Sequence, residues 1–303
     1  IFKNNIYISD NVGFIYALNA KTGELLWVKN HGIPLKSNIK VMNNKIYLIN
    51  QDNRIICLDV KDGSLIWNLR SISSFIKSQN LLSIALTKQG DVVALSSYGD
   101  LFKINGSNGN IYWSTNTSFN LLAHSTDFFK SSKIVINGNN VIFSSGQIFY
   151  SYNLLNGYLN WEKNYSSVGA PIIENGNIFL VTENGFFLAV NQDSGKIIVS
   201  KNILNSLKKR KQDTRIAGFI MGSGKIYSTT INGFLIITSA KTGIFVIAET
   251  MAVHIPIPAL RNVGQAGGRL EDIRDSHEFI SLPRGAHVPD HQAPFARHRQ
   301  DQG

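Results

Sequence analysis

The chain has 303 residues, of which 43% are hydrophobic and 17% charged, with a formal net charge of +10. This length can bury a large core, and the abundance of Asn, Ile, Ser and Gly suits short strands joined by tight turns better than long helices with salt-bridged faces. The sequence has no run of about 18 apolar residues, which argues against a membrane-spanning helix. The composition therefore predicts an all-β protein.

The chain opens on a strand-like segment, Ile6 to Ile8, without an initiator Met. Its first residues also lack the charged and then apolar layout of a secretory signal. We therefore expect the true N-terminus to lie upstream of Ile1.

A repeat of 38 to 48 residues then runs along the chain, marked by six glycines: Gly23, Gly63, Gly109, Gly157, Gly195 and Gly243. An Asn or Asp stands four residues before each of the first five glycines, where its side chain can bond the backbone and begin a turn that the glycine closes. All four tryptophans of the chain stand four residues after such a glycine, at Trp27, Trp67, Trp113 and Trp161. The fifth and sixth copies carry Val199 and Ile247 there. We predict that the glycines close turns and that the tryptophans are buried between neighbouring sheets.

Each repeat contains several strand-like segments, most clearly in the fifth copy. Ile178 to Thr182 and Phe186 to Val190 flank the turn residues Asn184 and Gly185, and Lys196 to Val199 follow Gly195. A further strand, Ala170 to Glu174, precedes them. Four antiparallel strands in each copy predict a β-propeller of four-stranded blades, with six repeats visible.

The sequence from Ala17 to Trp27 resembles the signature of the PQQ-like propeller repeat family, Ala-x-Asp-x-x-Thr-Gly-x-x-x-Trp, with Asn19 in place of the Asp. The resemblance covers residues 1 to about 247 and is greatest to the propeller lipoproteins of the bacterial outer-membrane β-barrel assembly machinery. It implies an eight-bladed, non-catalytic scaffold at the periplasmic face of the outer membrane. Such a scaffold binds the barrel-inserting subunit through that subunit's periplasmic repeat domains, assists outer-membrane protein insertion, and reaches the membrane only through a lipid anchor that this sequence lacks.

The PQQ-dependent quinoprotein dehydrogenases resemble the repeats as well and provide the alternative function. The function of these enzymes would require a catalytic Asp and a calcium shell of Glu, Asn and Asp, and it commonly involves a vicinal disulfide. The chain has a single cysteine, Cys57, which excludes that disulfide. The sequence has 13 acidic residues before position 244, many of them in turns. We therefore assign no catalytic, cofactor-binding or metal-binding residue, and expect a protein that is not an enzyme and needs no cofactor.

The single cysteine and one run of basic residues each have a structural interpretation and a functional alternative. Cys57 lies in an apolar strand and is expected to be a buried hydrophobe, rather than a reactive thiol or a lipid-anchor cysteine. The run Lys208 to Lys211 is expected to be a solvated loop, with a patch for an acidic partner or anionic lipid as the alternative. No basic stripe with interleaved aromatic residues occurs, so nucleic acid is not a predicted partner.

The composition changes near residue 248, where Pro, Arg and His replace Lys and Asn. We expect residues 1–247 to form the propeller and residues 248–303 to be a non-propeller tail, disordered or of foreign origin. His287, His291 and His298 could imitate a metal site, but no strand or helix pattern supports them.

Overall fold

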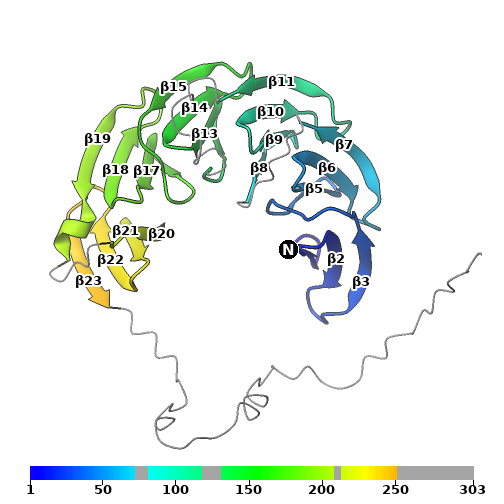
Figure 1. Ribbon diagram of the computed structural model, residues 1–303, viewed down its shortest axis with the longest axis horizontal. Coiled ribbons are helices and arrows are strands. Elements are labelled where there is room, and N and C mark those ends of the chain that lie inside the picture. The colour runs from blue at the N-terminus through cyan, green and yellow to red at the C-terminus, as the bar shows by residue number, and fades with distance from the viewer. Residues whose placement is uncertain (72–80, 118–130, 208–212, 251–303) are drawn as a thin grey trace, which may run out of the picture. The chain divides into compact units, whose positions relative to one another are not determined.

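The computed structural model describes residues 1–71, 81–117, 131–207 and 213–250 (Figure 1). These residues form 23 strands and one short 3₁₀ helix, η1 (Ile203–Ser206). None of the described residues belongs to a helix long and apolar enough to cross a membrane. The predicted all-β class is confirmed.

Six antiparallel sheets follow one another along the described residues, and we call them blades 1 to 6 (Figure 1). Blade 1 has three strands and the other five have four each, paired in chain order. The strands of blades 1 to 3 are β1 (Asn5–Ser9), β2 (Phe14–Asn19), β3 (Leu25–Asn30); β4 (Lys40–Met42), β5 (Lys45–Ile49), β6 (Arg54–Asp59), β7 (Leu65–Arg70); and β8 (Ser83–Leu86), β9 (Val92–Leu95), β10 (Asp100–Ile104), β11 (Ile111–Asn116). Those of blades 4 to 6 are β12 (Val135–Asn137), β13 (Asn140–Ser145), β14 (Ile148–Asn153), β15 (Leu159–Lys163); β16 (Ile172–Glu174), β17 (Asn177–Val181), β18 (Phe186–Asn191), β19 (Ile197–Asn202); and β20 (Ile216–Gly222), β21 (Lys225–Thr230), β22 (Phe234–Ser239), β23 (Phe245–Thr250).

In blades 2 to 5 the two middle strands are buried on both faces, which explains their continuous runs of apolar residues. In β17 and β18, every residue of Ile178–Val181 and of Phe187–Val190 is buried. The last strands of these blades are more exposed instead, and in β19 four of the six residues are exposed. A sheet with two buried faces needs a neighbour on each side, so these patterns favour stacked sheets over a single sheet with one wet face.

The core consists of apolar clusters between consecutive sheets. One cluster joins Tyr47 and Ile55 of blade 2 to Val92 and Phe102 of blade 3. Equivalent clusters join blade 1 to 2, 3 to 4, 4 to 5, and 5 to 6. Cys57 lies in the first of these clusters with no exposed surface, and burial raises the pKa of its thiol to about 12. The expectation that Cys57 is a buried hydrophobe is confirmed.

The last strand of blade 6 ends beyond the predicted domain boundary. Strand β23 continues to Thr250, past the boundary expected at residue 247. The predicted tail from residue 251 onward lies outside the described residues, and so do the Lys208 to Lys211 run and the candidate metal ligands His287, His291 and His298.

Candidate functional site

Each tryptophan of the repeat lies in the last strand of its blade and contacts the next blade. Its indole Nε1–H donates a hydrogen bond of 3.0 to 3.1 Å to a main-chain carbonyl three residues before the next repeat glycine. The donor and acceptor pairs are Trp27 with Val60, Trp67 with Gly106, Trp113 with Leu154, and Trp161 with Gln192. We call this arrangement the inter-blade joint.

A register shift aims the tryptophan side chain. In blade 4, Ser151 pairs with Trp161 while Tyr152 pairs with Leu159, so Asn160 is the extra residue of a bulge. The same shift precedes the repeat position in the other blades. A bulge re-aims the neighbouring side chain and increases the local twist. Sequence reasoning missed this bulge, because the extra residue has no distinctive type.

The repeat glycine of the next blade lies beneath the indole ring. A methyl group added at Gly157 would lie 2.6 Å from Cε3 of Trp113, and one added at Gly195 would lie 2.7 Å from Cδ2 of Trp161. Gly63 and Gly109 stand in the same relation to Trp27 and Trp67. The glycine therefore has two functions: it closes the turn with a positive φ and it leaves room for the ring.

The Asn or Asp before each glycine holds the turn that carries the acceptor carbonyl. The Asn153 side chain accepts hydrogen bonds from the main-chain N–H groups of Leu155 and Asn156 at 2.8 and 3.4 Å. This Asx turn fixes the carbonyl of Leu154, which accepts the hydrogen bond of Trp113. The turn chemistry seen in the sequence thus positions one half of the joint.

The tryptophans are less uniformly covered than the sequence predicts. Trp67 and Trp161 are buried, with 8% of each side chain exposed, whereas Trp27 and Trp113 are only partly buried. All four lie in last strands, where one ring edge can face solvent while the other contacts the next blade. All four residues are therefore covered for the most part, and Trp67 and Trp161 most completely.

The two ends of the repeat series differ from its middle. Gly23 of blade 1 has the same positive φ as the other repeat glycines, yet a methyl group there would meet nothing within 4 Å. At the interface between blades 5 and 6, Gly243 lies against Lys201, Phe187 and Val199 in place of an indole.

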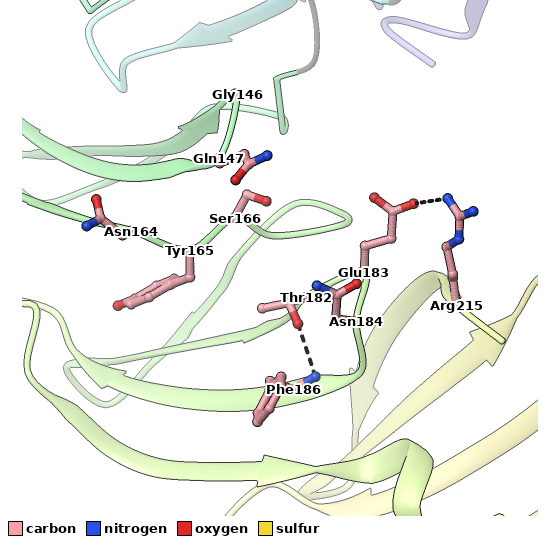
Figure 2. Close-up of a pocket in the computed structure, with 10 residues that line it drawn as sticks. All are labelled: Gly146, Gln147, Asn164, Tyr165, Ser166, Thr182, Glu183, Asn184, Phe186 and Arg215. Atoms are coloured by element: carbon pink, nitrogen blue, oxygen red, sulfur yellow. Dashed lines mark hydrogen bonds and ion pairs between the residues drawn. The ribbon is translucent and has the colours of Figure 1, made fainter. Parts of the chain in front are cut away.

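A polar pocket of about 490 Å³ lies across blades 4, 5 and 6 (Figure 2). It is built from the β13–β14 turn, the segment after β15, the β17–β18 turn and the residue before β20. These turns are at the opposite ends of β14 and β18 from the inter-blade joints. The lining residues shown in Figure 2 are Gly146, Gln147, Asn164, Tyr165, Ser166, Thr182, Glu183, Asn184, Phe186 and Arg215.

An ion pair crosses this pocket from blade 5 to blade 6. A guanidinium nitrogen of Arg215 lies 3.4 Å from Oε1 of Glu183 (Figure 2), and both side chains are exposed. The main-chain N–H of Ile216 also donates to the Glu183 carbonyl at 3.0 Å, which ties the two segments together. Because the pair is exposed, its own contribution to stability is small and its charges stay accessible to a partner.

Tyr165 is one of the lining residues of the pocket (Figure 2). Its ring packs against Phe149 with centroids 5.7 Å apart. Its hydroxyl is buried without a hydrogen-bond partner among the described residues, and burial raises its pKa to about 12. The tyrosine is therefore a neutral hydroxyl at physiological pH, able to donate or accept one hydrogen bond.

No group of three or more His, Cys, Asp or Glu side chains that could hold a metal is found among the described residues. A second pocket of about 830 Å³ is lined by the first strands of blades 3, 5 and 6 and by the segments that precede the first strands of blades 2 to 5, and Lys133 is the one charged side chain among its described lining residues. The polar pocket offers hydroxyls, amides and one ion pair, which suit hydrogen bonding to a polypeptide.

Stacked four-stranded antiparallel blades linked by Trp and Gly in the last strand and its turn define a β-propeller of PQQ-like repeats. The solved structure of BamB from Moraxella catarrhalis has this fold, with a TM-score of 0.68 and 15% identity over 82% of this chain and 73% of that one. The profile of the family described as outer membrane protein assembly factor BamB matches residues 2–201. The chain belongs to this family.

Individual relatives are distant. The outer membrane protein assembly factor BamB of Moranella endobia (strain PCIT) is 22% identical over an alignment of 228 positions, which covers 66% of this chain and 56% of that protein. The chain therefore spans little more than half the length of this relative. A quinoprotein ethanol dehydrogenase of Pseudomonas putida is 32% identical, but only over an alignment of 72 positions, which covers 21% of this chain and 12% of the enzyme.

Proposed function

We propose that this protein is a non-catalytic propeller scaffold of the outer-membrane β-barrel assembly machinery, which binds the barrel-inserting subunit and assists the insertion of outer-membrane proteins. The observation that carries the proposal is the family match over residues 2–201. The same kinship supports a location at the periplasmic face of the outer membrane, an anchoring lipid outside this sequence, and eight blades in the whole protein.

The polar pocket is the proposed contact surface for the partner. It draws on three blades, so its walls are held by the β-sheets and not by one loop. Its exposed Glu183 and Arg215 can exchange their mutual pairing for pairing with opposite charges of a partner segment. The amides and hydroxyls around them can bond a partner main chain.

The quinoprotein alternative has less support. The match to the dehydrogenase corresponds to less than two PQQ-type repeats of this chain. The described residues that line the 830 Å³ pocket contribute no carboxylate that could serve as a calcium ligand or as a base. Both observations favour a scaffold.

A pull-down from envelope extract tests the assignment and the contact surface together. We expect the wild-type chain to retain the barrel-inserting subunit and Arg215→Glu to retain much less of it, because this change places two carboxylates side by side in the pocket. Lys196→Glu is the matched control, since it makes the same charge change at an exposed site beside the Gly195 turn, and it should bind as the wild type does.

A second arm addresses enzymatic activity. Calorimetric titration with pyrroloquinoline quinone and calcium, followed by a dye-linked dehydrogenase assay, should give no binding and no turnover. Tight quinone binding with alcohol or sugar oxidation, and no envelope partner, would overturn the scaffold assignment. Retention of the subunit with equal loss for both charge variants would place the contact outside the polar pocket.

A further inference from the structure

The interface between blades 5 and 6 contains a cavity where the other full joints hold an indole ring. The cavity measures about 270 Å³ and is lined by Val199 and Ala189 of blade 5 and by Met221 and Ala240 of blade 6, among other residues. Val199 is the fifth-repeat residue at the tryptophan position. Its side chain is far smaller than an indole, which accounts for space at this interface.

The backbone around the cavity matches that of the joints with tryptophan. Val199 pairs with Ala189 next to a bulge, as Trp161 pairs with Ser151. Ala240 stands three residues before Gly243, at the position whose carbonyl accepts the indole N–H in the other joints. Among the described residues, no donor reaches the Ala240 carbonyl. The cavity therefore presents the acceptor of a joint together with its apolar wall.

Phe187 occupies part of the space that an indole ring fills in the other joints. Its equivalent in blade 4, Phe149, shows how a phenyl ring and an indole ring can share this space. A methyl group at Gly243 would lie 3.0 Å from Cδ1 of Phe187 and 3.2 Å from Cγ1 of Val199. Phe149 holds the same position in blade 4, eight residues before the repeat glycine, and packs against Trp161 with ring centroids 5.7 Å apart. A phenyl ring and an indole ring are thus accommodated together in a joint of this chain.

We propose that this cavity binds the indole ring of a tryptophan side chain from another polypeptide, with the indole N–H donating to the Ala240 carbonyl. The chain itself supplies the precedent, since four of its indoles make this contact from extended strands. The surroundings suit a polypeptide because exposed Ile198 borders the cavity as further apolar surface, and the exposed Glu174 and Lys241 offer charges of both signs at its rim. The proposal is independent of the assembly role and of the polar pocket.

The direct test follows side-chain methyl signals of Ala189, Val199 and Met221 by NMR while a hexapeptide with one central tryptophan, flanked by serine and threonine, is added to the full chain. We expect saturable shifts at these methyls, and an affinity for the peptide at least several-fold higher than for free indole. A peptide with 1-methyltryptophan, which has no indole N–H, should bind several-fold more weakly. Equal affinity of free indole and peptide, or no saturable shift at millimolar peptide, would overturn the proposal.

A protein-side variant gives a second readout. Val199→Trp should supply the missing ring, raise the Tm and abolish peptide binding. Val246→Trp makes the same exchange at an exposed residue of β23 and should leave binding intact. A Val199→Trp chain that melts lower than wild type, while Val246→Trp does not, would show that the site cannot accept an indole and would contradict the proposal. Val199→Ala enlarges the cavity, so that chain should still bind the peptide.

Discussion

Gly23 and Gly157 occupy the same turn position in two repeats but have different surroundings. Their φ angles are +72° and +75°, so an L side chain would be strained at both. Only Gly157 also has an indole ring above it, at a distance that a methyl group could not share. The pair separates the backbone role of the repeat glycine from its packing role.

This pair predicts unequal effects of the same substitution. Gly23→Ala should lower the free energy of unfolding by about 1–2 kcal/mol, the usual cost of a left-handed L residue. Gly157→Ala should lower it by about 1–3 kcal/mol more, because overpacking displaces Trp113. Urea denaturation of the two variants measures the difference, and equal losses would show that the ring imposes no constraint on the glycine.

His31 predicts a pH dependence of stability. Burial and the nearby charge of Lys29 lower its pKa below the ordinary value of 6.5, and its Nε2 has no partner among the described residues. The unfolded chain therefore binds this proton more readily than the folded chain does. Stability should be complete above pH 6.5 and should fall as the pH drops below that value.

The measurement compares the wild type with His31→Gln, an uncharged variant, by urea denaturation between pH 7.5 and pH 5. The wild type should lose more stability over this interval than the variant. Parallel losses in the two chains would assign the pH dependence to other groups.

At the scale of elements, the joint between Trp161 and blade 5 combines packing with one hydrogen bond. Trp161→Ala should lower the free energy of unfolding by about 3–5 kcal/mol, because it removes a large buried ring. Trp161→Phe keeps an aromatic ring but leaves the Gln192 carbonyl without its donor, and should cost less, about 1–3 kcal/mol. A phenylalanine variant as unstable as the alanine one would mean that the hydrogen bond, and not the ring, dominates the joint.

The repeat sequence predicts the strands well because each of its positions has one local structural role. Asn184 and Gly185 stand in the turn between β17 and β18, and Ile178 to Val181 are buried as expected. The bulge beside each tryptophan was not predictable, since it is set by pairing across strands and not by residue type. The position of the Trp113 ring above Gly157 was not predictable either, because this ring comes from the preceding repeat.

The polar pocket was beyond sequence reasoning for a different reason. Its residues come from four separate segments of three blades, and none of them belongs to the repeat signature. Glu183 and Arg215 meet only because blades 5 and 6 are neighbours, so their pairing has no fixed spacing in the sequence. Repeat positions reveal the core, whereas binding surfaces form where the repeats differ.

At the scale of the whole molecule, we propose that residues 1–250 carry the propeller without help from the residues that follow. The apolar clusters each join two consecutive blades, so stability accumulates from neighbour to neighbour. A chain that stops at Thr250 should therefore keep the Tm of the full chain in a calorimetric scan. A clearly lower Tm would show that later residues cover blade 6.

The inter-blade joint also has a consequence for how such proteins change in length. Repeats 2 to 4 each carry a ring for the blade after them and, in their own turns, a glycine and a carbonyl for the ring of the blade before them. A tandem duplication of one of these repeats therefore brings matching halves to both new junctions without any compensating mutation. Gain or loss of a blade in a single recombination event is compatible with intact contacts, and blade number can vary faster among descendants than the chemistry that holds the blades together.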